Sequence, residues 1–130
     1  MQLGFVSAIL PEASLADVFE TGSEYGYDCV ELMCWPPGTA DRRYAGVTHF
    51  DASNISDTTI NELSGLCSTH NISVSGLGYY PNALSPDLDV ANIATHHILQ
   101  VIEATAAIGA PSMNTFIGRD WTKSIDDNWQ

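Results

Sequence analysis

The chain has 130 residues, the length of one ordinary domain, and 45% of them are hydrophobic, which is enough to form a buried core. Sixteen acidic residues against four basic ones give a net charge of -12, which would repel a nucleic-acid backbone or an anionic membrane surface. No apolar run approaches the roughly 20 residues of a membrane-spanning helix, so we expect a soluble domain without nucleic-acid or membrane partners.

The start of the sequence shows no secretory signal. Met1 is followed directly by the strand-like run LGFVSA, without a basic region or a long apolar segment. Cys29, Cys34 and Cys67 have neither a disulfide framework nor a zinc spacing. Both observations favour a reducing, cytoplasmic location.

Strand and helix signals alternate from the start of the chain. Residues 3–8 (LGFVSA) predict a first strand, and residues 14–17 (SLAD) have the Ser-x-x-Asp form of a helix cap. Gly26 stands where that helix should end. Residues 29–35 (CVELMCW) predict a second strand, which residues 36–38 (PPG) stop, and a long loop follows.

The same alternation continues through the second half. A helix is predicted from Ser56, with an apolar face formed by Ile60, Leu63 and Cys67. Residues 72–80 (ISVSGLGYY) predict a third strand, and residues 112–118 (SMNTFIG) a fourth. Between them we expect a long helix with a stripe of Val90, Ile93, Ala94, His97, Val101 and Ile108. Ser124 begins what looks like a fourth capped helix.

This alternation indicates the α/β class, because a helix between strands favours parallel pairing through right-handed crossovers. A complete (β/α)8 TIM barrel needs about 250 residues, roughly twice what this sequence supplies. We therefore expect residues 1–130 to be a single partial domain, the N-terminal half of such a barrel, cut within helix four. A small open sheet of four strands is the alternative.

Glu31 is the first candidate site residue. Successive side chains of a strand face opposite sides, so Glu31 should share a face with Cys29, Met33 and Trp35 and look into the barrel. A carboxylate is tolerated there only beside a cation, a metal or hydrogen-bond donors. Two interpretations remain open: a carboxylate held by internal donors, or an acceptor for a substrate hydroxyl.

Other candidates follow the carboxyl ends of the predicted strands, where α/β proteins bind ligands. Trp35 could stack on a sugar or serve only in packing, and either Tyr79 or Tyr80 should point inward. The amide of Asn114 can both donate to and accept from a hydroxyl, or satisfy a local hydrogen bond. Arg119 could clamp a phosphate or carboxylate, or form a solvated ion pair.

The loop after the second strand holds two of the four basic residues, Arg42 and Arg43, which could meet an anionic substrate. His49 and Asp51 are too weak a signal to predict a metal site. The sequence also lacks a dinucleotide-binding Gly-x-Gly-x-x-Gly start, a Walker loop and a Gly-x-Ser-x-Gly elbow.

The segments GFVSAILP, GYDCVELMCWPPG, RRYAGVTH, SGLGYYPNAL and NTFIGRD together resemble the start of a sugar phosphate isomerase/epimerase of the xylose isomerase-like TIM-barrel superfamily. The resemblance covers essentially the whole chain. It implies metal-assisted proton transfer next to the carbonyl of a small sugar or sugar phosphate. It also implies a divalent ion (Mn, Mg, Co or Zn), held by Glu, Asp, His and Glu drawn mainly from strands five to eight.

Strands five to eight are not among these 130 residues. The resemblance therefore implies that the chain supplies one wall of the substrate pocket, without metal ligands or an assigned catalytic residue. The substrate-facing candidates are Glu31, Trp35, Tyr80, Asn114, Arg119 and Arg43.

Two other functions stay open at this point. The chain could be a non-catalytic half-barrel that associates with another chain, including a homo-oligomer, because open strand edges favour pairing. It could also resemble the class II apurinic endonucleases of the same superfamily. The net charge of -12 and the lack of histidines at the ends of strands one, three and four oppose a DNA-binding enzyme.

Overall fold

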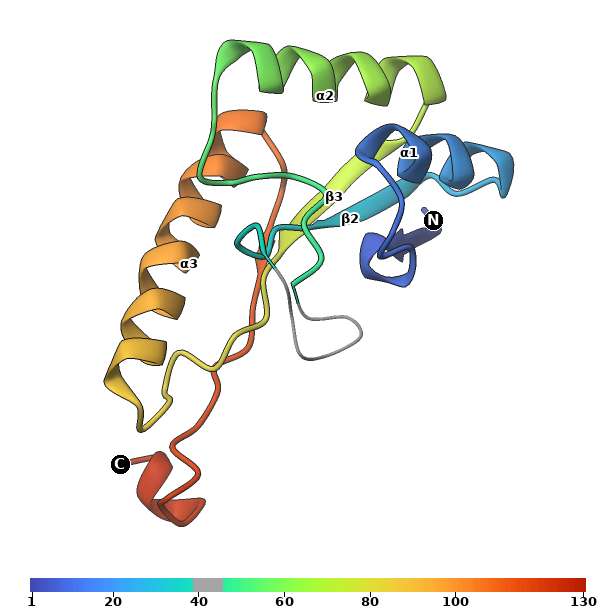
Figure 1. Cartoon of the computed structure of the whole chain (residues 1–130). Coiled ribbons are helices and arrows are strands. Elements are labelled where there is room, and N and C mark those ends of the chain that lie inside the picture. Colours follow the sequence, from blue (N-terminus) through green and yellow to red (C-terminus); the bar gives the residue numbers. More distant parts are fainter. Residues whose placement is uncertain (39–45) are drawn as a thin grey trace.

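The computed structural model describes residues 1–38 and 46–130. Its sheet has four parallel strands in the order β1-β2-β3-β4. The strands are β1 (Gly4–Val6), β2 (Cys29–Met33), β3 (Ser73–Gly78) and β4 (Met113–Asn114). The helices are α1 (Leu15–Glu24), α2 (Asp57–His70) and α3 (Leu88–Ile108), with short 3-10 turns η1 (Ser7–Ile9) and η2 (Asp126–Asn128). Strands that follow one another in the sequence lie side by side in the sheet and are joined through helices (Figure 1). This arrangement confirms the α/β class and is that of half of a (β/α)8 barrel.

The helices begin and end where local sequence signals place them. Ser14 and Asp17 form a reciprocal capping box at the start of α1, and Ser56 and Thr59 form another at α2. Asp87 caps α3 by accepting from two backbone N–H groups of its first turn. Asn71 and Gly109 end α2 and α3 in the left-handed conformation.

The hydrophobic core lies between the sheet and the three helices, which cover one face of it (Figure 1). It joins α1, both central strands, α2 and α3 through Val18, Phe19, Val30, Leu32, Leu63, Leu77, Val101 and Ala104. Among the described residues no helix covers the opposite face of the sheet. That inner face is where Glu31 projects.

Several expected boundaries and faces differ from the structure. The predicted stripe of α3 is wrong at Val90 and Ile93, which are 47% and 63% exposed, because the first turns of the helix project past the carboxyl ends of the strands (Figure 1). Strand β4 is only two residues long: among the described residues it pairs with β3 alone, through Met113 and Asn114, and β3 ends at Gly78. Ser124 does accept from the backbone N–H of Asp127, but the element that follows is the 3-10 turn η2 and not an α-helix.

Among the residues placed in the structure, no helix is both long and apolar enough to span a membrane.

Candidate functional site

A cluster of three polar side chains forms on the inner face of the sheet. The Tyr80 hydroxyl donates to Oε1 of Glu31, and Nδ2 of Asn114 donates to Oε2 of the same carboxylate at 2.9 Å. The three residues come from β2, from the segment after β3 and from β4, and all are half-buried. Glu31 is thus held by hydrogen-bond donors, and it shares a face with Asn114 as the strand alternation predicts.

Two glycines of β3 make this cluster possible. Gly78 pairs with Met33 and Asn114, and Gly76 pairs with Glu31, so both lie on the inner face between β2 and β4. A Cβ on Gly78 would collide with Oε1 of Glu31, and a Cβ on Gly76 would lie 3.1 Å from Nδ2 of Asn114. The side chains of Glu31 and Asn114 therefore meet across β3, in space that only glycine leaves open.

The protonation state of Tyr80 follows from its contacts. Burial raises the pKa of Tyr80, and the hydrogen bond to Glu31 and its negative charge raise it further. The phenol therefore remains a neutral donor in the physiological range. An ionised carboxylate only accepts hydrogen bonds, so the amide of Asn114 must turn its nitrogen toward Glu31. The result is a fixed polar patch beside Met33, which is buried on the same face against Ala8 and Val47.

Trp35 occupies a different environment from Glu31. Strand β2 ends at Met33, so the alternation that predicted a shared face does not reach residue 35. The rings of Trp35 and Tyr79 meet edge to face, with centroids 5.0 Å apart. The indole also packs against the hydrophobic core and against a smaller buried cluster of Ala8, Met33 and Val47. Tyr79 in turn contacts His97 of α3, which leaves Tyr80 as the inward-facing tyrosine. Contact between Trp35 and a substrate stays a prediction.

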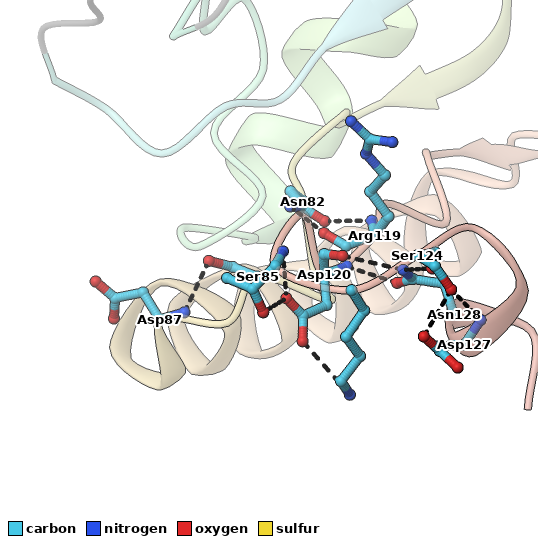
Figure 2. Close-up of polar contacts among 10 residues, drawn as sticks. Asn82, Ser85, Asp87, Arg119, Asp120, Ser124, Asp127 and Asn128 are labelled. Carbon is cyan, nitrogen blue, oxygen red and sulfur yellow. Dashed lines mark hydrogen bonds and ion pairs between the residues drawn. The ribbon is translucent and has the colours of Figure 1, made fainter.

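Arg119 is fixed by its backbone, not by its side chain. The side-chain amide of Asn82 accepts from the Arg119 N–H and donates to its carbonyl, both at 2.8 Å (Figure 2). Asn128 binds the backbone of Asp120 in the same two-point manner, at 2.7 and 3.0 Å. Gly118 adopts a φ of 76°, and a Cβ there would collide with Asn82. The loop after β4 is therefore clamped to the loop after β3.

The side chain of Arg119 is exposed and points away from Asp120 in Figure 2. The ion pair in this region joins Lys123 and Asp120, at 3.4 Å. Arg119 is thus available to an anionic group, and a clamp on a substrate stays a prediction. Arg43, with Arg42, lies outside the described residues.

Sequence reasoning missed Gly76, Gly78 and Asn82. The alternating glycines of SGLG were a usable signal, because glycine inside a strand marks a close approach of another group. Asn82 carried no such signal, since its partner lies 37 residues away in the chain.

The residues placed in the structure offer no metal centre: nowhere do three or more His, Cys, Asp or Glu side chains gather. His49 is buried and its Nε2 donates to the Leu10 carbonyl at 3.1 Å, while Oδ1 of Asp51 accepts from Ser53. These residues do not fit the divalent ion that the resemblance implies.

His49 should make the protein sensitive to acid. Burial lowers the pKa of His49, partly opposed by the carbonyls of Leu10 and Ala13, and its Nδ1 is buried without a hydrogen-bond partner. Its stabilising contribution is present above pH ~6.5, the unfolded value, and is lost as the pH falls through the lower folded value. The loss for this one group approaches about 1.4 kcal/mol per pH unit.

Urea unfolding at a series of pH values between neutral and acid would check this, with His49→Gln compared with the parent protein. The parent should lose more stability on acidification than His49→Gln, because glutamine does not titrate. His96→Gln, at an exposed histidine of α3, controls for replacing a histidine. Parallel stability curves for the parent and His49→Gln would contradict the expectation.

A four-stranded parallel sheet with helices on one face and a polar cluster on the other defines half of a (β/α) barrel. The profile of the family described as Xylose isomerase-like TIM barrel matches residues 19–130. The chain therefore belongs to the xylose isomerase-like TIM barrel family.

A solved structure of similar fold supports the same architecture. It is that of the probable 3-DHS dehydratase AsbF involved in petrobactin synthesis from Bacillus anthracis, with a TM-score of 0.60 and 18% sequence identity. The match covers 89% of this chain and 38% of that one, so the present chain spans well under half of the length of its structural neighbour. No curated protein sequence matches this chain.

Proposed function

We propose that the chain is part of a sugar or sugar phosphate isomerase/epimerase, in which it supplies one wall of the substrate pocket. The observation that carries the proposal is the Glu31, Tyr80 and Asn114 cluster on the open inner face, near the carboxyl ends of the strands. Barrel enzymes bind substrates at that end. Membership of a family of barrel enzymes and the polarity of the cluster both suit a polyhydroxylated ligand.

The proposed reaction is proton transfer next to a carbonyl, assisted by a divalent metal ion (Mn, Mg, Co or Zn). The described residues contain no group of three or more His, Cys, Asp or Glu that could hold that ion, and we propose that its ligands come from strands five to eight of the barrel. This chain's own residues would bind and orient the hydroxyl groups of the substrate. The three free cysteines fit the reducing cytoplasm that we propose as its location.

Hydrogen-deuterium exchange tests the proposal. The protein in its native length is incubated in D2O with ketoses and their phosphates, with each of the four metals added in turn. Deuterium should appear at the carbon next to the carbonyl, by proton NMR, only with a metal present. The substitution Asn114→Ala should weaken substrate binding while leaving metal content unchanged. Absence of exchange with every substrate and metal would rule the reaction out.

The same spectra separate isomerisation from dehydration, the activity named for the structural neighbour. Loss of water would give an unsaturated product, whereas isomerisation or epimerisation keeps the elemental composition. An unsaturated product would show a dehydratase in place of an isomerase. The proposal that this chain forms one wall of the substrate pocket would still stand.

A second candidate function is a non-catalytic half-barrel that pairs with another copy of itself. It is favoured by the outer edges of β1 and β4, which have no strand partner among the described residues, and by exposed Val6, Phe116 and Ile117. Sedimentation velocity over a wide concentration range should then show a dimer that forms without metal. A monomer at every concentration would contradict this candidate and leave the isomerase proposal standing.

A further inference from the structure

We propose that Asn114 is the residue of the inner-face cluster that touches a substrate hydroxyl, and that Glu31 and Tyr80 are positioning residues that act through it. The inference rests on the proposed function, because it assigns roles within the same pocket wall. It changes the simplest interpretation of the cluster, in which the carboxylate itself receives the substrate.

The hydrogen bonds of Glu31 carry the first step. Oε1 accepts from Tyr80 and Oε2 accepts from Asn114, so each oxygen is engaged within the protein. Because a carboxylate accepts only, it fixes the amide nitrogen of Asn114 toward itself. Among the described residues no hydrogen bond engages the amide carbonyl Oδ1 or the second N–H of Asn114, so both can serve a ligand. A fixed amide of this kind can accept from one hydroxyl and donate to another.

The charge of the cluster carries the second step. Asn114 presents a carbonyl oxygen beside the negative carboxylate of Glu31, so an anionic group at this point would meet repulsion. A neutral hydroxyl would donate to Oδ1 and avoid that cost. This wall therefore selects the hydroxyl-bearing part of a substrate, and any phosphate would lie away from it.

The third step is the geometry of β3. The bridge from Glu31 to Asn114 crosses a whole strand, and it does so over Gly78 and Gly76, where a Cβ would displace the carboxylate or crowd the amide. Removing the Tyr80 donor or filling this space should free the Glu31 carboxylate, and with it the amide of Asn114. Gly76 and Gly78 therefore help Glu31 and Tyr80 to hold the amide of Asn114 in place.

A spectroscopic test requires no substrate. In 15N-labelled protein the side-chain amide of Asn114 is identified by its loss in Asn114→Ala. Tyr80→Phe and Gly78→Ala should shift and broaden that resonance, whereas Tyr25→Phe, at an exposed ring, and Gly65→Ala, at an open position on α2, should not. In Glu31→Gln the pKa of Tyr80 should fall toward its ordinary value. An unchanged Asn114 amide in Tyr80→Phe would overturn the positioning role, even if Gly78→Ala fails to fold.

A binding cycle separates the roles. The probe is a neutral ketohexose such as D-fructose, titrated by NMR into the parent, Tyr80→Phe, Asn114→Ala and the double variant. Tyr80→Phe should weaken binding about fivefold in the parent background and have no effect once Asn114 is alanine. An equal loss in both backgrounds would mean that Tyr80 or Glu31 reaches the sugar independently, and would overturn the proposal.

The outcomes of these two tests distinguish a failure of the positioning proposal from a failure of the proposed function. If the ketohexose binds and the cycle is additive, the pocket wall stands and the positioning proposal falls. If the amide of Asn114 responds as expected but the ketohexose does not bind, Glu31 and Tyr80 still orient the amide, and the substrate-contact role given to Asn114 falls. The deuterium-exchange experiment then decides the proposed function separately.

Discussion

Replacing Leu32 by alanine should lower the free energy of unfolding by about 3–5 kcal/mol. Leu32 is completely buried in β2, on the face that all three helices cover. The substitution removes apolar contact and leaves a cavity that β2, held between β1 and β3, cannot close. Urea unfolding followed by circular dichroism measures the change.

Leu99→Ala is the matched control, because the same atoms are removed from a side chain that is 55% exposed in the middle of α3. Its effect should stay within about 0.5 kcal/mol, since surface substitutions away from special contacts are nearly neutral. Similar losses at both positions would show that the helices do not seal this face of the sheet in solution.

Local signals were enough to predict the order of elements. The capping residues Ser14 and Ser56 act within one turn of their own helices, so their chemistry is visible in a short stretch of sequence. The alternation of CVELM likewise placed Leu32 toward the helices and Glu31 toward the inner face. Parallel pairing then brought Glu31 and Asn114 to one side of the sheet.

What alternation could not predict begins at the irregularity between β2 and β3. The register shifts between Val30 and Glu31, so Val74 pairs with Val30 but Gly76 pairs with Glu31, and Ser75 is left over. Without that extra residue, Ser75 would stand opposite Glu31. Gly76 and Gly78 would then pair with residues of the helix-covered face and not with those of the inner face. A bulge depends on the partner strand, so the sequence of β3 alone does not reveal it.

A contact between distant segments also explains why the expected position of Trp35 was wrong. Trp35 was expected to continue the face of Glu31, but Cys34 forms an isolated antiparallel bridge with Thr48 and the chain turns away. The hydroxyl of Thr48 donates to the Trp35 carbonyl at 2.6 Å, which fixes the new direction. Such contacts join segments on opposite sides of a loop, and their geometry is decided by packing, not by periodicity.

His97→Ala should destabilise the protein by about 2–4 kcal/mol, although the residue is polar and lies on a helix. Its Nε2 donates to the carbonyl of Cys34 at 2.7 Å, and its ring stands edge-on against Tyr79 with centroids 4.7 Å apart. Alanine would leave that buried carbonyl at the end of β2 without its donor and open a cavity beside Tyr79. The gain in helix propensity from alanine is below about 1 kcal/mol and cannot offset this.

His96→Ala provides a control one residue away, because His96 is exposed and has the same helical environment. We expect it to be neutral or slightly stabilising in the same unfolding experiment. His97→Gln should recover part of the loss if the hydrogen bond matters, since an amide can donate to the Cys34 carbonyl but cannot make the edge-to-face ring contact with Tyr79. Equal stabilities for His96→Ala and His97→Ala would contradict the role of His97 as the link between α3 and the segment that follows β2. Trp35 lies in that segment, directly after Cys34.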